Sequence, residues 1–273
     1  MRTEDAVASH YRNPALEESI LEALERTGHD PQRLQPDDLL AVDQFHIGGV
    51  QAARDIAVGA GIGASSTVLD IGSGLGGPAR LFAHHFGAQV IGVDLTPEFV
   101  EAATSLTLRA GLAEKVAFVQ GSGLDLPFAE DEFDVVTLLH VGMNIDNKPA
   151  LFQNVARVLK PGGVFAVYDV MRTGAGEIVY PLPWAASAEI SFPATPEEYR
   201  QALEETHFTV ESTRNLRNEG IEFAQRGPQP GEPPPPLGMH LVLGPEGRTR
   251  MGNLLAAMTA GTLAPVEMFA RLG

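Results

Sequence analysis

Cysteine is absent from this chain of 273 residues, and tryptophan occurs only once. Without cysteine there is no disulfide framework, no thiolate ligand for a metal ion and no cysteine nucleophile. We also do not expect the histidines to form a metal site in place of cysteines. His84 and His85 are adjacent on a predicted helix, where neighbouring side chains point in different directions. We therefore expect no metal centre.

Basic residues are scarce relative to acidic ones, with 19 Lys and Arg against 35 Asp and Glu and a net charge of −16. A surface this acidic repels phosphate backbones, which argues against nucleic acid as a partner. Long apolar runs are also missing, since none approaches the roughly 20 residues of a membrane span. The polar N-terminus lacks the apolar core of a signal peptide. We expect a cytoplasmic protein, not bound to membranes, that is a monomer or homodimer.

Glycines gather at one point, in the segment Val68–Gly77. An apolar run over 67–71 predicts a buried strand, and a helical pattern over 78–86 follows the glycines. Glycines at a strand-to-helix turn let the backbone pass close under a ligand, and the helix N-terminus offers free N–H groups. This arrangement predicts a nucleotide-like cofactor on a Rossmann-type sheet.

The glycines alone do not decide which class of nucleotide-like cofactor is bound. Gly72, Gly74 and Gly77 satisfy the G-x-G-x-x-G pattern that is typical of nicotinamide and flavin enzymes. Against this, Asp70 stands two residues before the first glycine, where dinucleotide folds usually have an apolar residue. Asp94 ends the next predicted strand, where a carboxylate can accept the ribose hydroxyls of either cofactor.

Predicted strands and helices alternate along the centre of the chain, which indicates an α/β protein with a parallel, doubly wound, Rossmann-like sheet. A ligand of such a sheet lies at the carboxyl ends of the strands. We expect strands at 67–71, 89–93, 116–120, 133–139 and 163–169, and helices at 14–27, 48–58, 78–86, 97–110, 149–159, 196–206 and about 246–260. The proline-rich run 228–236 suits polyproline II or turns but no sheet interior.

Two further motifs complete a resemblance. "LPFAEDEFDVVTLLH" spans 126–140 and "ARVLKPGGVFAVYDV" spans 156–170. Together with the Asp-x-Gly-x-Gly-x-Gly stretch and the acidic end of the next strand, they resemble class I S-adenosylmethionine (SAM) dependent methyltransferases over roughly residues 64–170. Within that class the chain is similar to small-molecule enzymes of the sarcosine/dimethylglycine, phosphoethanolamine and quinone/tocopherol types.

The resemblance implies a seven-stranded sheet that is parallel except for an antiparallel last strand, with 208–216 and 265–272 as its final pair. We accordingly expect N-terminal helices and a C-terminal cap around the core. The expected parts are an N-terminal helical cap at 1–63, a SAM-binding Rossmann-like core at 64–216, a cap insertion at 217–264 and a final core strand at 265–273. A cap helix with Leu254, Leu255 and Met258 on one face is expected to supply walls of the substrate pocket.

The resemblance also implies SAM as the cofactor and S-adenosylhomocysteine (SAH) as its product. The glycine loop would face the methionine part, Asp70 its amino group and Asp94 the ribose. Many relatives have an acidic residue after the third strand that accepts the adenine amino hydrogen, and here Ser122 stands at that position. The expected cofactor-binding residues are Tyr11, Gln44, Asp70, Gly72, Ser73, Gly74, Gly76, Asp94, Leu95, Ser122, Gly123, Leu124 and His140.

The N-terminal "VDQFHIGG" segment (42–49) places several polar residues between two predicted helices. In the relatives that it resembles, this segment and a tyrosine near the chain start lie over the cofactor. By that match Tyr11, Gln44 and His46 would contact SAM or substrate, and His46 is a candidate catalytic residue. Asp43 is either a helix N-cap or a substrate ligand.

Other candidate substrate contacts follow the fourth and fifth strands. His140 is either a general base or a residue that shapes the pocket through a hydrogen bond. Asn144 either binds a polar substrate group or caps its loop. Tyr180 and Trp184 either bind an apolar or cationic substrate or anchor their segment to the core.

These features predict a SAM-dependent methyltransferase that acts on N or O of a small soluble metabolite. Methyl transfer needs mainly alignment of the acceptor and exclusion of water, because the methyl group already carries a good leaving group. Two other functions remain open at this point. One is a NAD-dependent oxidoreductase on a Rossmann fold, and the other is a SAM-binding protein without catalysis.

Overall fold

A seven-stranded sheet organises the molecule, in the order β3-β2-β1-β4-β5-β7-β6. The computed structural model describes residues 3–226 and 234–273, so most of the predicted proline-rich run 228–236 lies outside the described residues. β7 is antiparallel to both of its neighbours, and the pairs among β1 to β5 are parallel. The predicted architecture is confirmed. The strands are β1 Thr67–Ile71, β2 Gln89–Asp94, β3 Val116–Gln120, β4 Phe133–Leu139, β5 Leu159–Arg172, β6 Phe208–Asn215 and β7 Leu263–Leu272.

Helices cover both faces of the sheet, as the alternation predicted. On one face α7 and α8 bury Phe152 and Tyr199 against β4 and β5, and on the other face α4 and α5 bury Ile56 and Phe82. Successive residues of β4 and β5 alternate between these two layers, because side chains along a strand point to opposite faces. The helices are α4 Gly49–Gly59, α5 Gly77–Phe86, α6 Pro97–Arg109, α7 Lys148–Val158 and α8 Pro196–Glu205.

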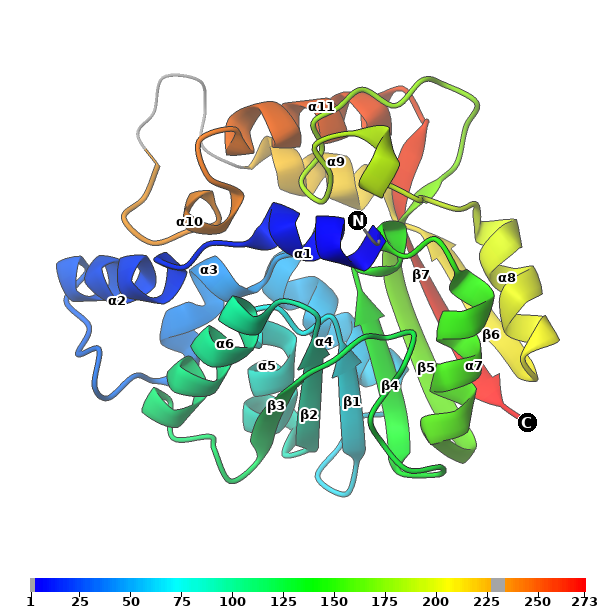
Figure 1. The fold of residues 1–273 in the computed structure, drawn as a ribbon, viewed down its shortest axis with the longest axis horizontal. Helices are drawn as coiled ribbons and strands as arrows, with labels where there is room; N and C mark the ends of the chain where they lie inside the picture. Colours follow the sequence, from blue (N-terminus) through cyan, green and yellow to red (C-terminus); the bar gives the residue numbers. More distant parts are fainter. Residues whose placement is uncertain (1–2, 227–233) are drawn as a thin grey trace.

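The remaining helices lie mainly beyond the carboxyl ends of the parallel strands (Figure 1). At the start of the chain are α1 Thr3–Tyr11, α2 Leu16–Arg26, the 3₁₀ helix η1 Pro36–Leu39 and α3 Leu40–Asp43; later come η2 Gly142–Asn144, η3 Ala188–Ile190, α9 Arg217–Gln225, α10 His240–Leu243 and α11 Gly247–Thr259. Helix α1 crosses above β1 and β4 in Figure 1 and was not predicted. Among the described residues, no helix combines the length and apolar character needed to cross a membrane.

Candidate functional site

A cavity lies at the carboxyl ends of β1, β2 and β4, beneath α1. Most of the predicted site residues line it, although they come from distant parts of the chain. Those that line it are Tyr11, Asp43, His46, Asp70, Gly72, Ser73, Gly74, Asp94, Leu95, Ser122, Gly123, Leu124, His140 and Asn144. Gln44, Gly76, Tyr180 and Trp184 are not among the lining residues.

The glycine loop is fastened to the end of the neighbouring strand. The N–H groups of Gly72 and Ser73 donate to the Val93 carbonyl at 2.7 and 3.1 Å. Gly74 has a φ of 52°, and a Cβ built there would meet no atom within 4 Å. Its open side therefore faces the cavity. The Ser73 hydroxyl is buried without a hydrogen-bond partner and lies against β2, because a Cβ built at Gly92 would meet its Oγ at 2.6 Å.

Gly76 has a different role from the one predicted. It is the N-cap of α5 in the left-handed region, with a φ of 81°. A Cβ there would meet Phe118 Cζ at 2.4 Å and Arg80 Nη1 at 2.9 Å. Gly76 is therefore required for the turn and for packing beneath the loop, and its assignment to the cofactor surface is wrong.

Asp70 holds an unsatisfied oxygen toward the cavity. Its Oδ1 accepts a hydrogen bond from Thr137 Oγ1 at 2.7 Å, whereas Oδ2 is buried without a partner. Burial is the main cause that raises the pKa of Asp70 to about 7; the Thr137 hydrogen bond opposes this increase and the charge of Asp94 adds to it. A cationic group beside Oδ2 would relieve this burial cost. Asp70 therefore suits an ammonium ligand, as predicted for the cofactor's amino group.

Asp94 is more completely engaged by the protein. Its Oδ2 accepts from the Gly74 N–H at 2.8 Å, and Oδ1 accepts from the Thr96 N–H at 2.9 Å. Burial raises the pKa of Asp94, and these backbone bonds oppose that change. Each carboxylate oxygen can accept a second hydrogen bond. The predicted contact with two hydroxyls thus remains available, and Asp94 also holds the glycine loop in place.

Ser122, on the loop after β3, is paired with a residue that sequence analysis missed. The Ser122 hydroxyl donates to the carboxylate of Glu4 in α1, and its oxygen accepts the Leu124 N–H at 3.0 Å. Glu4 itself lines the cavity. The Leu124 N–H is therefore engaged by Ser122 and is not free for a ring nitrogen of the cofactor. No local pattern marks Glu4, because it meets Ser122 only through the tertiary fold.

His140 is held at both ring nitrogens, which contradicts a role as general base. Nε2 lies 3.3 Å from the Ile47 N–H, and Nδ1 lies 3.1 Å from the Tyr168 carbonyl. The backbone contacts assign the proton to Nδ1 and leave Nε2 as an acceptor. Burial, together with the charge of His46, lowers the pKa of His140 to about 3. His140 therefore ties the end of β4 to the N-terminal segment and shapes the pocket.

Asp43 and Gln44 form a buried network under the loop. Asp43 Oδ2 accepts from Arg80 Nη2 at 2.8 Å, and its Oδ1 accepts from Gln44 Nε2 at 3.0 Å. Asp43 is the last residue of α3, so it is not an N-cap. Its carboxylate is neutralised by Arg80, so a role in binding substrate through that carboxylate is wrong. Gln44 supports Asp43 and does not reach the cavity lining.

His46 and Tyr11 meet the cavity from the N-terminal segment, as predicted. His46 Nε2 lies 3.0 Å from the Gly49 carbonyl, and burial lowers the pKa of His46 to about 4. Tyr11 donates its hydroxyl to Asn144 Oδ1 at 3.1 Å, and burial raises the pKa of Tyr11. Asn144 in turn donates to the Trp184 carbonyl at 3.0 Å. These bonds pin α1 to the loop after β4.

The aromatic pair after β5 is structural and does not line the cavity. Trp184 is 1% exposed and donates Nε1–H to Ser191 Oγ at 2.9 Å. It shares a buried cluster with Leu254 and Met258 of α11, against which Tyr180 is packed. The substrate-binding role predicted for Trp184 and Tyr180 is therefore wrong, and the anchoring alternative holds. Helix α11 packs on this cluster, whereas Val242 of α10 is the cap residue in the cavity wall.

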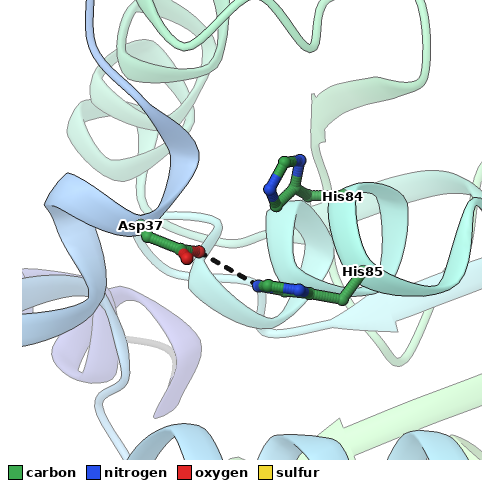
Figure 2. A group of neighbouring side chains, drawn as sticks. All are labelled: Asp37, His84 and His85. Atoms are coloured by element: carbon green, nitrogen blue, oxygen red, sulfur yellow. Dashed lines mark hydrogen bonds and ion pairs between the residues drawn. The ribbon is translucent and has the colours of Figure 1, made fainter.

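Away from the cavity, Asp37, His84 and His85 form a group of potential metal ligands whose ligand atoms lie within 4.8 Å of one another (Figure 2). The two histidine rings stand 4.7 Å apart, so the expectation that they diverge is wrong. All three side chains are exposed. A hydrogen bond of 3.0 Å joins His85 Nε2 to Asp37 Oδ1 and accounts for the approach of those two side chains.

Comparison with known proteins agrees with the fold and the cavity. Residues 69–167 match the family model of the methyltransferase domain. Over these residues the chain is therefore similar to the methyltransferase domain family, as the motifs predicted. The chain is 36% identical over 115 residues to a sterol 24-C-methyltransferase of Aspergillus fumigatus. These residues make up 42% of this chain and 30% of that protein.

A second curated relative, the erythromycin 3''-O-methyltransferase of Saccharopolyspora erythraea, is 36% identical over 122 residues, which cover 44% of this chain and 40% of the relative. The matches thus span less than half of either curated protein. Among solved structures, the geranyl diphosphate C-methyltransferase of Streptomyces coelicolor A3(2) has a TM-score of 0.71 at 15% identity, covering 100% of this chain and 99% of that one.

A sarcosine dimethylglycine methyltransferase from Galdieria sulphuraria has a TM-score of 0.64 at 21% identity, covering 81% of this chain and 85% of that one. The fold is thus shared with a class of small-molecule methyltransferases that the sequence resembles. At these identities the solved structures establish the fold alone.

Proposed function

We propose that this protein is a SAM-dependent methyltransferase acting on N or O of a small metabolite. The observation that carries the proposal is the buried Asp70 Oδ2, which has no partner and belongs to a residue that lines the cavity beside the glycine loop. A buried polar group is costly unless it is satisfied, so this oxygen indicates a ligand. An ammonium group, which SAM carries, fits it.

When bound, SAM supplies an activated methyl group on its sulfonium. The residues of this chain would then bind SAM and align it with the methyl acceptor. Asp70 would hold the amino group, the loop around Gly74 would lie along the methionine part, and Asp94 would accept from the ribose. Strand β4 ends at Leu139, so the segment 140–146 that follows it along the cavity is positioned to separate the cofactor from the acceptor.

The charges in the cavity support a neutral or cationic acceptor. Among the described residues that line it, the fixed charges are carboxylates and none is Lys or Arg. An anionic acceptor would find no cationic partner there and would be repelled by the acids. Tyr11, Phe45 and Phe99 supply aromatic walls. We therefore favour an amine or hydroxyl compound with an apolar body over a phosphorylated one.

If the acceptor arrives protonated, His46 is the group proposed to remove the proton. Its Nε2–H faces the Gly49 carbonyl, which makes Nδ1 the acceptor nitrogen of a neutral ring. Burial lowers the pKa of His46 to about 4, so the ring is neutral at physiological pH, with Nδ1 able to accept a hydrogen bond, but it is a weak base. His140 lacks such a free nitrogen. Location in the cytoplasm and a monomeric or homodimeric state remain predictions.

The test is transfer of a labelled methyl group from SAM to a panel of neutral, amine and phosphorylated metabolites, followed by mass spectrometry of the product. A methylated amine or alcohol supports the proposal. Binding of SAM without transfer to any panel member would favour a non-catalytic SAM-binding protein, and oxidation of a panel member with NAD would favour the oxidoreductase.

A further inference from the structure

Glu4 brings a carboxylate into the cavity from outside the methyltransferase core. It belongs to α1, which crosses the carboxyl ends of the strands (Figure 1), and it lines the cavity beside Ser122 and Gly123. The Ser122 hydroxyl donates to Glu4 across a separation of 118 residues. We propose that Glu4 is the residue that recognises the exocyclic amino group of the cofactor's adenine. This inference rests on the proposed function and deepens it.

The order of the strands indicates that the adenine base lies near Ser122 and Glu4. β1 ends near Asp70, β2 beside it ends at Asp94, and β3 lies on the far side of β2. The register places Asp94 opposite Gln120, two residues before Ser122. A ligand with its amino group at Asp70 and its ribose at Asp94 therefore extends its base toward Ser122 and Glu4.

The hydrogen-bond donors and acceptors around Ser122 favour Glu4 over Ser122 as the acceptor for the adenine amino group. The Ser122 hydroxyl gives its single hydrogen to Glu4 and accepts the Leu124 N–H, so only one lone pair remains. The Glu4 carboxylate offers about four acceptor positions, of which Ser122 uses one. A carboxylate is also the stronger acceptor for an N–H donor. Ser122 consequently positions Glu4, and Glu4 meets the amino group.

Recognition by a carboxylate has a chemical consequence. The 6-amino group of adenine donates a hydrogen bond, whereas the 6-oxo group of hypoxanthine presents a lone pair. Glu4 would repel that lone pair, so the site should reject a 6-oxo cofactor. Tyr11 and Asn144 hold the C-terminal end of α1, and Ser122 holds Glu4 near its start, so a base bound at Glu4 would add a further contact to the start of the helix.

Calorimetric titration of SAH and of S-inosylhomocysteine, its 6-oxo analogue, tests this assignment without requiring turnover. The wild-type protein should bind SAH at least about tenfold more tightly than the analogue. Glu4→Gln should reduce that preference to about threefold or less, because an amide can also donate to the oxo group. The ratio of the two affinities is the readout, so a general loosening of α1 does not imitate the result.

Two variants complete the test. Ser122→Ala keeps the carboxylate and should retain most of the preference, and Glu18→Gln, an exposed change on α2, should leave it unaltered. A preference that survives in Glu4→Gln, or that disappears in Ser122→Ala alone, would overturn the role of Glu4. Failure of the wild-type protein to bind SAH at all would overturn the proposed function itself, and the assignment with it.

Discussion

At the scale of single residues, the two strand-end carboxylates differ in what they leave free. Both oxygens of Asp94 hold backbone N–H groups, whereas Asp70 uses only one oxygen. Asp94 is therefore partly a structural residue that fixes the glycine loop. Asp70 has an oxygen, Oδ2, that is buried without a partner and that a ligand could hydrogen-bond.

The raised pKa of Asp70 predicts a pH-dependent affinity for SAH. The bound ammonium favours the ionised carboxylate, which the free protein holds with a pKa of about 7. Affinity should be highest near pH 8 and fall about tenfold toward pH 6, as the carboxyl becomes protonated. Calorimetry across this range measures the profile. An exposed control, Glu114→Gln, should follow the wild-type curve, and a flat wild-type profile would contradict the role of Asp70.

The same pKa predicts that Asp70→Asn stabilises the ligand-free protein. Folding raises the pKa of this acid, so its ionised form costs stability, and stability from this group falls as pH rises from about 4 to about 7. Asparagine cannot ionise, so at pH 8 unfolding should require about 1–3 kcal/mol more, while SAH binding weakens. Chemical denaturation with and without SAH measures both effects. A less stable variant at pH 8 would refute this explanation.

His140 is predicted to matter through structure. It has a φ of 57° and joins Ile47 to Tyr168 through its ring, so His140→Ala loses two hydrogen bonds. We expect a loss of about 1–2 kcal/mol in stability and weaker SAH binding, with no change in the shape of the pH–rate profile. If the rate fell about 100-fold with SAH affinity intact, the general-base role would have to be restored.

At the scale of elements, the sequence predicts those helices and strands that carry an apolar pattern. All seven strands and the helices α2, α4 to α8 and α11 lie within a few residues of their expected positions. Helix α1 was missed because it buries only Val7 and so has no apolar stripe to recognise. Its bonds to Ser122 and Asn144 come from the tertiary fold. The four-residue α10 is too short to show periodicity.

The cap helices α10 and α11 have different roles, and one substitution in each helix can distinguish them. Met258 of α11 is fully buried beside Trp184, so Met258→Ala should destabilise the protein by about 2–4 kcal/mol and leave the Michaelis constants nearly unchanged. Val242 of α10 lines the cavity. Val242→Trp should raise the KM for the methyl acceptor with little effect on stability. Reversal of these two results would place the pocket wall on α11.

At the scale of the whole molecule, local motifs and long-range contacts contribute different parts of the site. The glycine loop, Asp70 and Asp94 could be predicted because they are consecutive in the sequence or end successive strands. The pairing of Asp43 with Arg80, and of Glu4 with Ser122, could not, because only the topology brings these residues together. For the same reason the sequence left Trp184 with two alternatives, since a segment's composition does not say which layer it packs against.

The central claim is that this cavity binds SAM rather than a nicotinamide cofactor. The most direct measurement is calorimetric titration of the wild-type protein with SAM, SAH and NAD at about pH 8, where Asp70 is mostly ionised. We expect saturable binding of SAM and SAH with one site per chain and no heat of binding from NAD. Binding of NAD in the absence of SAM and SAH binding would contradict it.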